Sequence, residues 1–154
     1  MDSRYVRMVY SVVLFGLVLI QQPLLFAKGS RIPLPLQKWH VHVVNGLTND
    51  TLSVHCKSKD DDLGPHNLLS IGAEFQWSFK INVWRTTLYW CLLHKPNADV
   101  SFDAFWVERK HIWLFYRCMN QNCIWIAKDD GIYLRNNPDN FDELIHNWGE
   151  TKLI

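Results

Sequence analysis

The sequence has no excess of charge of either sign. Its 154 residues include 16 Lys and Arg against 15 Asp and Glu. Three of the basic and one of the acidic residues precede residue 30, so 13 basic and 14 acidic residues remain beyond it. A near-neutral chain has no overall field that would attract it to nucleic acid or to an anionic membrane. We therefore expect no nucleic-acid partner, and we expect local surface shape and chemistry to select the partner.

The sequence also lacks a hydrophobic run long enough to cross a membrane comfortably. The apolar run at residues 12–20 follows Arg4 and Arg7 and ends at the polar break of residues 21–23. A spanning helix needs about 20 apolar residues, so an uncleaved membrane anchor is the less favoured interpretation. A basic start, a short apolar run and a polar break are typical of a secretory signal peptide. We expect a secreted, extracellular protein with no stable membrane insertion after cleavage.

The processing site sets the expected domain bounds. Small residues at Ala27 and Gly29 predict cleavage after Gly29, with cleavage after Ala27 as the alternative. Pro33 and Pro35 disfavour helix and predict an extended segment. The expected organisation is therefore a signal peptide at residues 1–29, an extended lead-in at 30–37 and one β-sandwich domain at 38–154.

The chain has few cysteines, and their number is even. All four lie beyond the signal peptide, which predicts two disulfides in an oxidising compartment. The count alone allows three pairings. Cys118 and Cys123 bracket a polar turn, so a bridge between them is sterically easy and leaves Cys56 to pair with Cys91. We favour this pairing.

Motifs for nucleophilic catalysis and for metal binding are missing. The sequence has no Gly-x-Ser-x-Gly elbow and no pair of Cys-x-x-Cys motifs. His40, His42 and His55 lack a carboxylate or cysteine at ligand spacing, which favours solvent-facing histidines over a metal site. The adjacent aspartates at 60–62 point apart, which favours a capped turn over a calcium site. We expect no enzyme, metal or cofactor, while a glycosidase-type carboxylate pair on separate strands stays open.

Aromatic residues are the strongest compositional signal. The eight tryptophans are spread along the chain, as expected when each strand gives one large side chain to a shared core. A sugar-stacking role for one or two of them is the alternative to the core. The tryptophans are Trp39, Trp77, Trp84, Trp90, Trp106, Trp113, Trp125 and Trp148.

Apolar and polar residues alternate with a period of two through most of the chain, which is typical of strands with one buried face. The sequence Asp-Gly at 130–131 predicts a tight hairpin turn. Helical spacing is suggested only at 142–147. We predict an all-β fold, a small antiparallel β-sandwich or partly closed barrel of about eight strands. The expected strands are 39–44, 51–57, 74–81, 86–92, 102–107, 112–118, 123–128 and 132–135.

Polar loops between the strands are free to vary without disturbing the core, so we expect recognition there. Three loops are candidates for receptor binding, at 57–65, 94–99 and 108–111. Their candidate residues are Asp60, Asp61, Asp62, Lys95, Asn97, Arg109 and Lys110. In a separate turn, Asn49-Asp50-Thr51 is an N-glycosylation sequon, and we expect Asn49 to carry a glycan.

Three sequence blocks, in order, resemble the plant self-incompatibility S-protein homologue family. The blocks are VNGL at 44–47 with LSVHCKSKDDDLG at 52–64, FQWSF at 75–79 with TTLYWC at 86–91, and CIW at 123–125 with DDGIY at 129–133. The resemblance covers nearly the whole expected domain and all four cysteines. One departure is Tyr89, where the family commonly has phenylalanine before Trp-Cys.

The resemblance implies a small secreted β-sandwich with two disulfides. For the founding members it implies a ligand secreted by the stigma that triggers rejection of self pollen through a pollen membrane receptor. We therefore expect a non-enzymatic protein ligand for cell-cell signalling that acts as a monomer on a cell-surface receptor protein. A secreted carbohydrate-binding module, which needs exposed coplanar tryptophans, and a small secreted hydrolase are the rival hypotheses.

Overall fold

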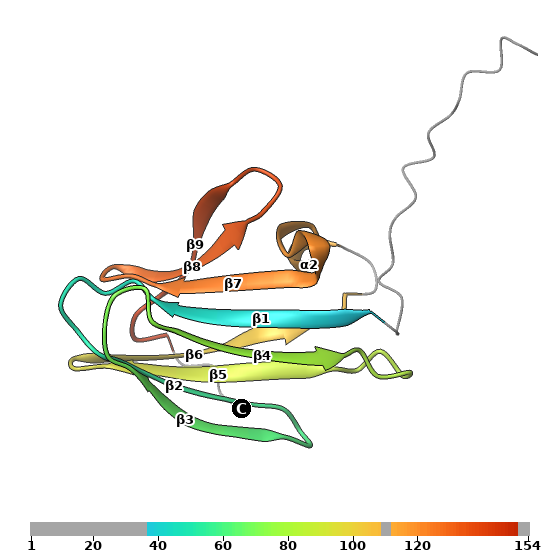
Figure 1. Ribbon diagram of the computed structural model, residues 1–154, viewed down its shortest axis with the longest axis horizontal. Helices are drawn as coiled ribbons and strands as arrows, with labels where there is room; N and C mark the ends of the chain where they lie inside the picture. The colour runs from blue at the N-terminus through green and yellow to red at the C-terminus, as the bar shows by residue number, and fades with distance from the viewer. Residues whose placement is uncertain (1–36, 109–111, 151–154) are drawn as a thin grey trace, which may run out of the picture. The chain divides into compact units, whose positions relative to one another are not determined.

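The computed structural model describes residues 37–108 and 112–150, and within these ranges the chain is mostly β-strand (Figure 1). The strands are β1 (Lys38–Asn45), β2 (Leu52–Lys57), β3 (Asp62–Leu68), β4 (Glu74–Lys80), β5 (Leu88–Lys95), β6 (Ala98–Trp106), β7 (Asn122–Ala127), β8 (Gly131–Asn136) and β9 (Phe141–Asn147). A short helix α2 (Trp113–Arg117) and a 3-10 turn η1 (Met119–Gln121) separate β6 from β7.

The strands form two sheets that pack face to face. The five-stranded sheet has the order β4-β1-β7-β8-β9, and the four-stranded sheet has the order β3-β2-β5-β6. Strands β1, β2 and β7 alternate strictly between buried and more exposed residues, so each turns one buried face to the opposite sheet. The predicted all-β sandwich is therefore confirmed.

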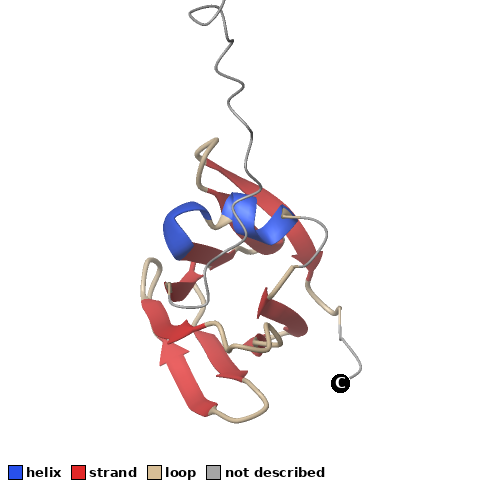
Figure 2. Cartoon of the chain, turned by 90° about the vertical axis from the view of Figure 1, so that its right-hand side faces the viewer, coloured by secondary structure: helices blue, strands red, loops and turns tan. Residues whose placement is uncertain are grey.

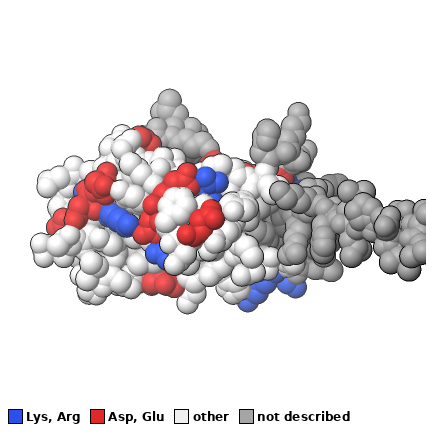
Figure 3. Space-filling view, turned by 90° about the horizontal axis from the view of Figure 1, so that it is seen from above, with Lys and Arg blue, Asp and Glu red and all other residues white. Residues whose placement is uncertain are grey.

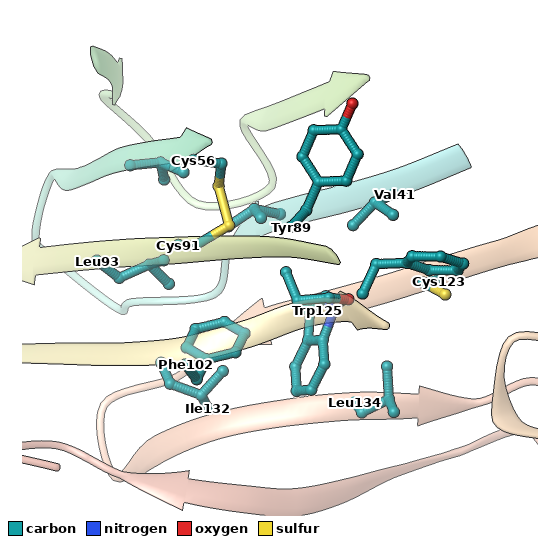
Figure 4. Close-up of a cluster of buried hydrophobic side chains, with 14 of the residues drawn as sticks. Val41, Cys56, Tyr89, Cys91, Leu93, Phe102, Cys123, Trp125, Ile132 and Leu134 are labelled. Atoms are coloured by element: carbon teal, nitrogen blue, oxygen red, sulfur yellow. Dashed lines mark hydrogen bonds between the residues drawn. A yellow bond between two sulfur atoms is a disulfide. The ribbon is translucent and has the colours of Figure 1, made fainter. Parts of the chain in front are cut away.

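The core lies between the two sheets and includes both disulfides. The Cys56–Cys91 bridge can be followed in Figure 4. Trp125 on β7 is fully buried and packs on Phe102 of β6, with 4.7 Å between ring centroids. Its indole N–H donates a hydrogen bond of 2.9 Å to the carbonyl oxygen of Ala104, also on β6. A large ring from one sheet is thus tied to the backbone of the other.

The disulfides join Cys56 to Cys91 and Cys118 to Cys123, which is the pairing that the sequence favoured. Cys56 and Cys91 lie directly opposite each other on β2 and β5 in the middle of the four-stranded sheet. Cys118 and Cys123 join the end of α2 to β7. All four side chains are fully buried.

One strand pair departs from the expected antiparallel pattern. Strands β1 and β7 are parallel, with His40 opposite Asn122 and Asn45 opposite Ala127. Parallel neighbours require a crossover, and here the chain between β1 and β7 passes through β4 of the same sheet, the four strands of the other sheet and α2. A period of two gives no information on strand direction, so the sequence pattern did not reveal this pair.

The strand predicted at 112–118 is wrong, because Trp113–Arg117 is a helix. Neighbouring residues Leu114 and Phe115 are both buried, which a half-exposed strand would not allow. The carboxylate of Glu108 accepts hydrogen bonds from the backbone N–H groups of Leu114 and Phe115, and so satisfies amides of the first helical turn. Glu108 was expected at a hairpin tip, but it caps a helix.

Two further predictions are corrected at the sheet edges. The helical turn suggested at 142–147 is strand β9, the edge of the five-stranded sheet. Strand β3, the edge of the four-stranded sheet, begins at Asp62, inside the segment that was expected to be a loop up to Pro65. Gly64 and Pro65 argue against a central strand, but an edge strand tolerates both because one side forms no ladder hydrogen bonds.

Candidate recognition site

Loops gather at both ends of the sandwich, and the two ends differ. One end holds the β2–β3 loop (58–61) and the β4–β5 loop (81–87), which line a common hollow. We call it the recognition end; it lies at the right of Figure 1 and faces the viewer in Figure 2. The opposite end holds the β1–β2, β3–β4, β5–β6 and β7–β8 connections. A single binding surface made of loops can therefore include the loops of only one end.

The receptor-binding candidates predicted from sequence do not form one surface. Asp60 and Asp61 lie in the β2–β3 loop at the recognition end, and Asp62 begins β3. Lys95 and Asn97 lie at the β5–β6 connection, at the opposite end. The Lys95 ammonium is already engaged, since it donates to the Asp129 carbonyl oxygen at 2.7 Å and lies 4.6 Å from the Trp148 ring.

The remaining positions predicted from sequence lie either outside the described residues or at the opposite end of the sandwich. Arg109 and Lys110 lie outside the described residues, as does the predicted signal peptide. Asn49 is exposed in the β1–β2 connection, at the end opposite to the recognition end, and Thr51 of the same sequon is also exposed.

The most exposed apolar side chains of the recognition end form the tip of the β4–β5 loop. Val83 is 79% exposed and Trp84 is 78% exposed. A single exposed apolar residue is ordinary on a protein surface, but an aromatic ring with an apolar neighbour at a loop tip is a large area left in water. Tryptophan is also the residue type most enriched among the energetically dominant residues of protein interfaces.

Hydrogen bonds hold the β4–β5 loop in one conformation. The Asn82 side chain accepts from the Thr86 backbone N–H at 2.8 Å and donates to the Thr86 hydroxyl at 2.9 Å. The Asn82 backbone N–H donates to the Thr87 hydroxyl at 2.9 Å. Arg85 has a φ of 54° and donates its backbone N–H to the Asn82 carbonyl at 3.0 Å. The apolar tip is therefore presented by a preorganised loop.

A hollow of about 590 Å³ lies between the two loops of the recognition end. The Ser58 hydroxyl accepts from the backbone N–H groups of Asp60 and Asp61, which shapes the β2–β3 loop as a capped turn. Tyr89 on the wall donates its hydroxyl to the Asp61 carboxylate at 3.3 Å. Burial and then the nearby Asp61 charge raise the pKa of Tyr89, so this phenol stays protonated at physiological pH.

The burial of the tryptophans separates the two interpretations made from sequence. Trp39 and Trp125 are core residues, five others are partly buried, and Trp84 alone of the eight is exposed. The core interpretation, which was made for most of the tryptophans, does not extend to Trp84. One signal was present in the sequence: Trp84 lies in the Asn-Val-Trp-Arg segment after the alternation of β4 has ended.

Histidines and carboxylates of the described residues do not come together as a metal site. His42 lies on the five-stranded sheet with its Nδ1 at 2.7 Å from Glu74 Oε1. His55 lies on the four-stranded sheet, with its Nε2 at 2.6 Å from Asp62 Oδ1. His42 and His55 thus lie on strands of different sheets.

A second hollow, of about 480 Å³, lies between β6 and β9 and includes two carboxylates. One of them, Glu150, accepts from the Asn147 backbone and side chain, and these hydrogen bonds lower its pKa. A general acid for glycoside hydrolysis needs a raised carboxyl pKa. Glu150 therefore lacks the raised pKa that the hydrolase hypothesis requires of a general acid.

The outer surface around β8, β9 and α2 carries charges that are already paired. Arg117 donates to Glu143 at 2.6 and 2.9 Å, and Lys128 donates to Asp142 at 2.8 Å. Arg135 also pairs with Asp142. Figure 3 shows acidic and basic side chains intermixed on the face seen from above. The three cations named here, Arg117, Lys128 and Arg135, are thus each paired with a carboxylate.

Comparison with known proteins identifies the family to which this β-sandwich belongs. A family model described as plant self-incompatibility protein S1 matches residues 40–148, which include both disulfides and both loops of the recognition end. The chain belongs to this family. S-protein homolog 1 of Arabidopsis thaliana is 44% identical over 114 residues, which cover 73% of each chain. S-protein homolog 74 of the same plant is 38% identical over 149 residues, covering 94% of this chain and 96% of the relative.

A solved structure of a self-incompatibility protein homologue shares the fold, with a TM-score of 0.55 at 18% identity. The match covers 74% of this chain and 96% of the solved one, which is described as one of a widespread family of small, highly stable, secreted plant proteins. The predicted extracellular location is thus confirmed at the level of the self-incompatibility family. Among the residues that the structure describes, no helix has the length and apolar character needed to cross a membrane.

Proposed function

We propose that this self-incompatibility family member is a non-enzymatic, monomeric protein ligand that binds a cell-surface receptor protein through its recognition end. The observation that carries the proposal is the Val83–Trp84 tip, exposed on a hydrogen-bonded loop. Burying these two side chains in a partner removes apolar surface from water, while the preformed loop limits the entropy lost on binding. A rigid aromatic anchor is what a protein interface uses for most of its affinity.

The arrangement of tryptophans favours a protein ligand over a carbohydrate-binding module. A sugar-binding platform needs several exposed, coplanar rings, but Trp84 alone of the eight is exposed. Trp106 and Trp113 are nearly parallel, at an interplanar angle of 13°, but they stack on each other with 5.9 Å between centroids and are partly buried. These two rings form part of the packing and do not form a flat binding surface.

Substituting Trp84 with Ala should weaken binding to plant protoplasts at least tenfold, since an exposed aromatic anchor loses its buried contact with the partner. The measurement is saturation binding of the fluorescently labelled, disulfide-bonded protein. Leu69→Ala is the matched control, because Leu69 is 76% exposed in the β3–β4 loop at the opposite end. Equal affinities of the Trp84 and Leu69 variants would refute the proposed site.

We also propose that Asn49 carries a glycan that leaves the recognition end uncovered. Asn49 is exposed at the opposite end. Asn49→Gln should therefore reduce the mass by one glycan, with an unfolding midpoint and protoplast affinity close to those of wild type. Mass spectrometry of protein from a glycosylating host checks this prediction. An unchanged mass would show that the sequon is unoccupied, and a gain in affinity on removing the glycan would contradict its placement.

A further inference from the structure

Two lysines lie directly opposite each other at the edge of the recognition end. Lys38 on β1 and Lys80 on β4 are register partners in the antiparallel β1–β4 pair, so their side chains leave the same face of the sheet. Like charges in this position destabilise a sheet. Both lysines are exposed, and neither forms an ion pair with any residue in the described ranges.

These lysines adjoin the apolar tip. Lys80 is the last residue of β4 and precedes Val83 by three positions, and Arg85 follows Trp84 directly. Arg85 likewise has no ion pair within the residues that the structure describes. Three cations therefore flank the Val83–Trp84 tip, in contrast to the paired cations Lys128 and Arg135. An unneutralised cationic border around an aromatic anchor is complementary to an acidic border around an apolar pocket.

From this juxtaposition we propose that the partner of the recognition end is a protein surface with an apolar pocket for Trp84 and carboxylates that pair with Lys38, Lys80 and Arg85. The inference rests on the proposed function and adds the chemistry of the partner's epitope. The like-charge cost between the two lysines is relieved when carboxylates of the partner lie between or beside their ammonium groups. The cations act mainly on orientation and association rate, and Trp84 supplies most of the affinity.

The shape and the other charges of this end favour a protein over a lipid surface or a polysaccharide. Asp60 and Asp61 line the same hollow as Lys80, so a flat anionic bilayer that meets the cations also meets these carboxylates. A uniformly acidic polysaccharide meets the same repulsion. A protein surface can place charges of both signs, and its concave pocket accepts the protruding Val83–Trp84 tip.

The test measures binding of Lys38→Gln, Lys80→Gln and the double variant to intact protoplasts at low and high NaCl. The control matched to each single variant is Asn97→Asp, which also lowers the net charge by one, at the exposed β5–β6 turn of the opposite end. We expect the double variant to bind roughly fivefold more weakly at low salt and to lose much of the salt dependence of wild type. Asn97→Asp should keep both the affinity and the salt dependence.

The outcomes separate this inference from the proposed function. If the single and double lysine variants bind like wild type while Trp84→Ala still weakens binding at least tenfold, the acidic epitope is refuted and the recognition end stands. If Trp84→Ala binds like wild type, the recognition end itself fails. Binding that survives protease treatment of the protoplasts would overturn the assignment of the partner as a protein. The assignment would also fail if phosphatidylserine-containing vesicles or polygalacturonate bound the protein and the lysine substitutions weakened that binding. Loss of binding after protease treatment supports it.

Discussion

Replacing Cys56 and Cys91 with alanine should lower the free energy of unfolding by about 4 kcal/mol, and replacing Cys118 and Cys123 by about 2 kcal/mol. The first bridge closes a sequence separation of 35 residues and the second a separation of 5. In the chain-entropy model, a bridge restricts the unfolded chain in proportion to the logarithm of the loop that it closes. The bridge between β2 and β5 should therefore contribute more.

Burial does not account for this ranking, because all four cysteines are fully buried and each double substitution removes the same two sulfur atoms. Thermal unfolding of the two double variants provides the comparison, and the midpoint should fall by on the order of 10 °C for the first and about half of that for the second. Non-reducing peptide mapping of wild type first verifies the pairing. A larger loss on removing the Cys118–Cys123 bridge would contradict the loop-length argument.

The sequence predicted most of the sandwich because half-buried strands carry their own signal. In β4, Phe75, Trp77 and Phe79 pack against the core while Glu74 and Gln76 face water, so the period of two is visible in the residue types. The hairpin at Asp130-Gly131 is confirmed by the backbone hydrogen bond from Lys128 N–H to the Gly131 carbonyl at 2.8 Å. Local sequence patterns were sufficient to predict these elements.

Elements that depend on distant contacts were predicted less well. Residues 112–118 are as rich in aromatic and β-branched residues as a strand, but the Glu108 carboxylate and the burial of neighbouring side chains select a helix. At 142–147 the polar residues suggested a helical turn, but Asp142 pairs with Lys128 and with Arg135 of the neighbouring β8, and β9 extends the sheet. Tertiary contacts override local propensity at both places.

The candidate site could be predicted only in part for a similar reason. Asp60 and Asp61 were correctly placed in an exposed loop, because polar side chains in a turn carry a local signal. The exposure of Trp84 depends on where the β4–β5 loop leaves the sandwich, and composition alone favoured the core. Likewise, Lys38 and Lys80 lie 42 positions apart, and their direct opposition follows from the β1–β4 register.

Trp125→Ala should cost about 4 kcal/mol or more, whereas Trp84→Ala should leave stability within about 0.5 kcal/mol of wild type. Removing the fully buried Trp125 ring leaves a cavity between the sheets, and large aromatic truncations in a core typically cost 3–5 kcal/mol. A second loss arises at Ala104, which has no partner in the β5–β6 register because β6 bulges there. Its carbonyl oxygen accepts a hydrogen bond from the Trp125 indole N–H, so truncation also leaves a buried acceptor without a donor.

Trp125→Phe separates the two losses, because phenylalanine restores much of the buried apolar area but cannot donate a hydrogen bond to Ala104. Its free energy of unfolding should lie between those of wild type and Trp125→Ala, with a loss of about 1–3 kcal/mol due to the carbonyl that has lost its donor. Denaturant unfolding of the three variants measures the order. If Trp125→Phe were as stable as wild type, the indole N–H would not be needed at the bulge. If Trp84→Ala were as damaging as Trp125→Ala, Trp84 would be a structural residue and its proposed role at the recognition end would fail.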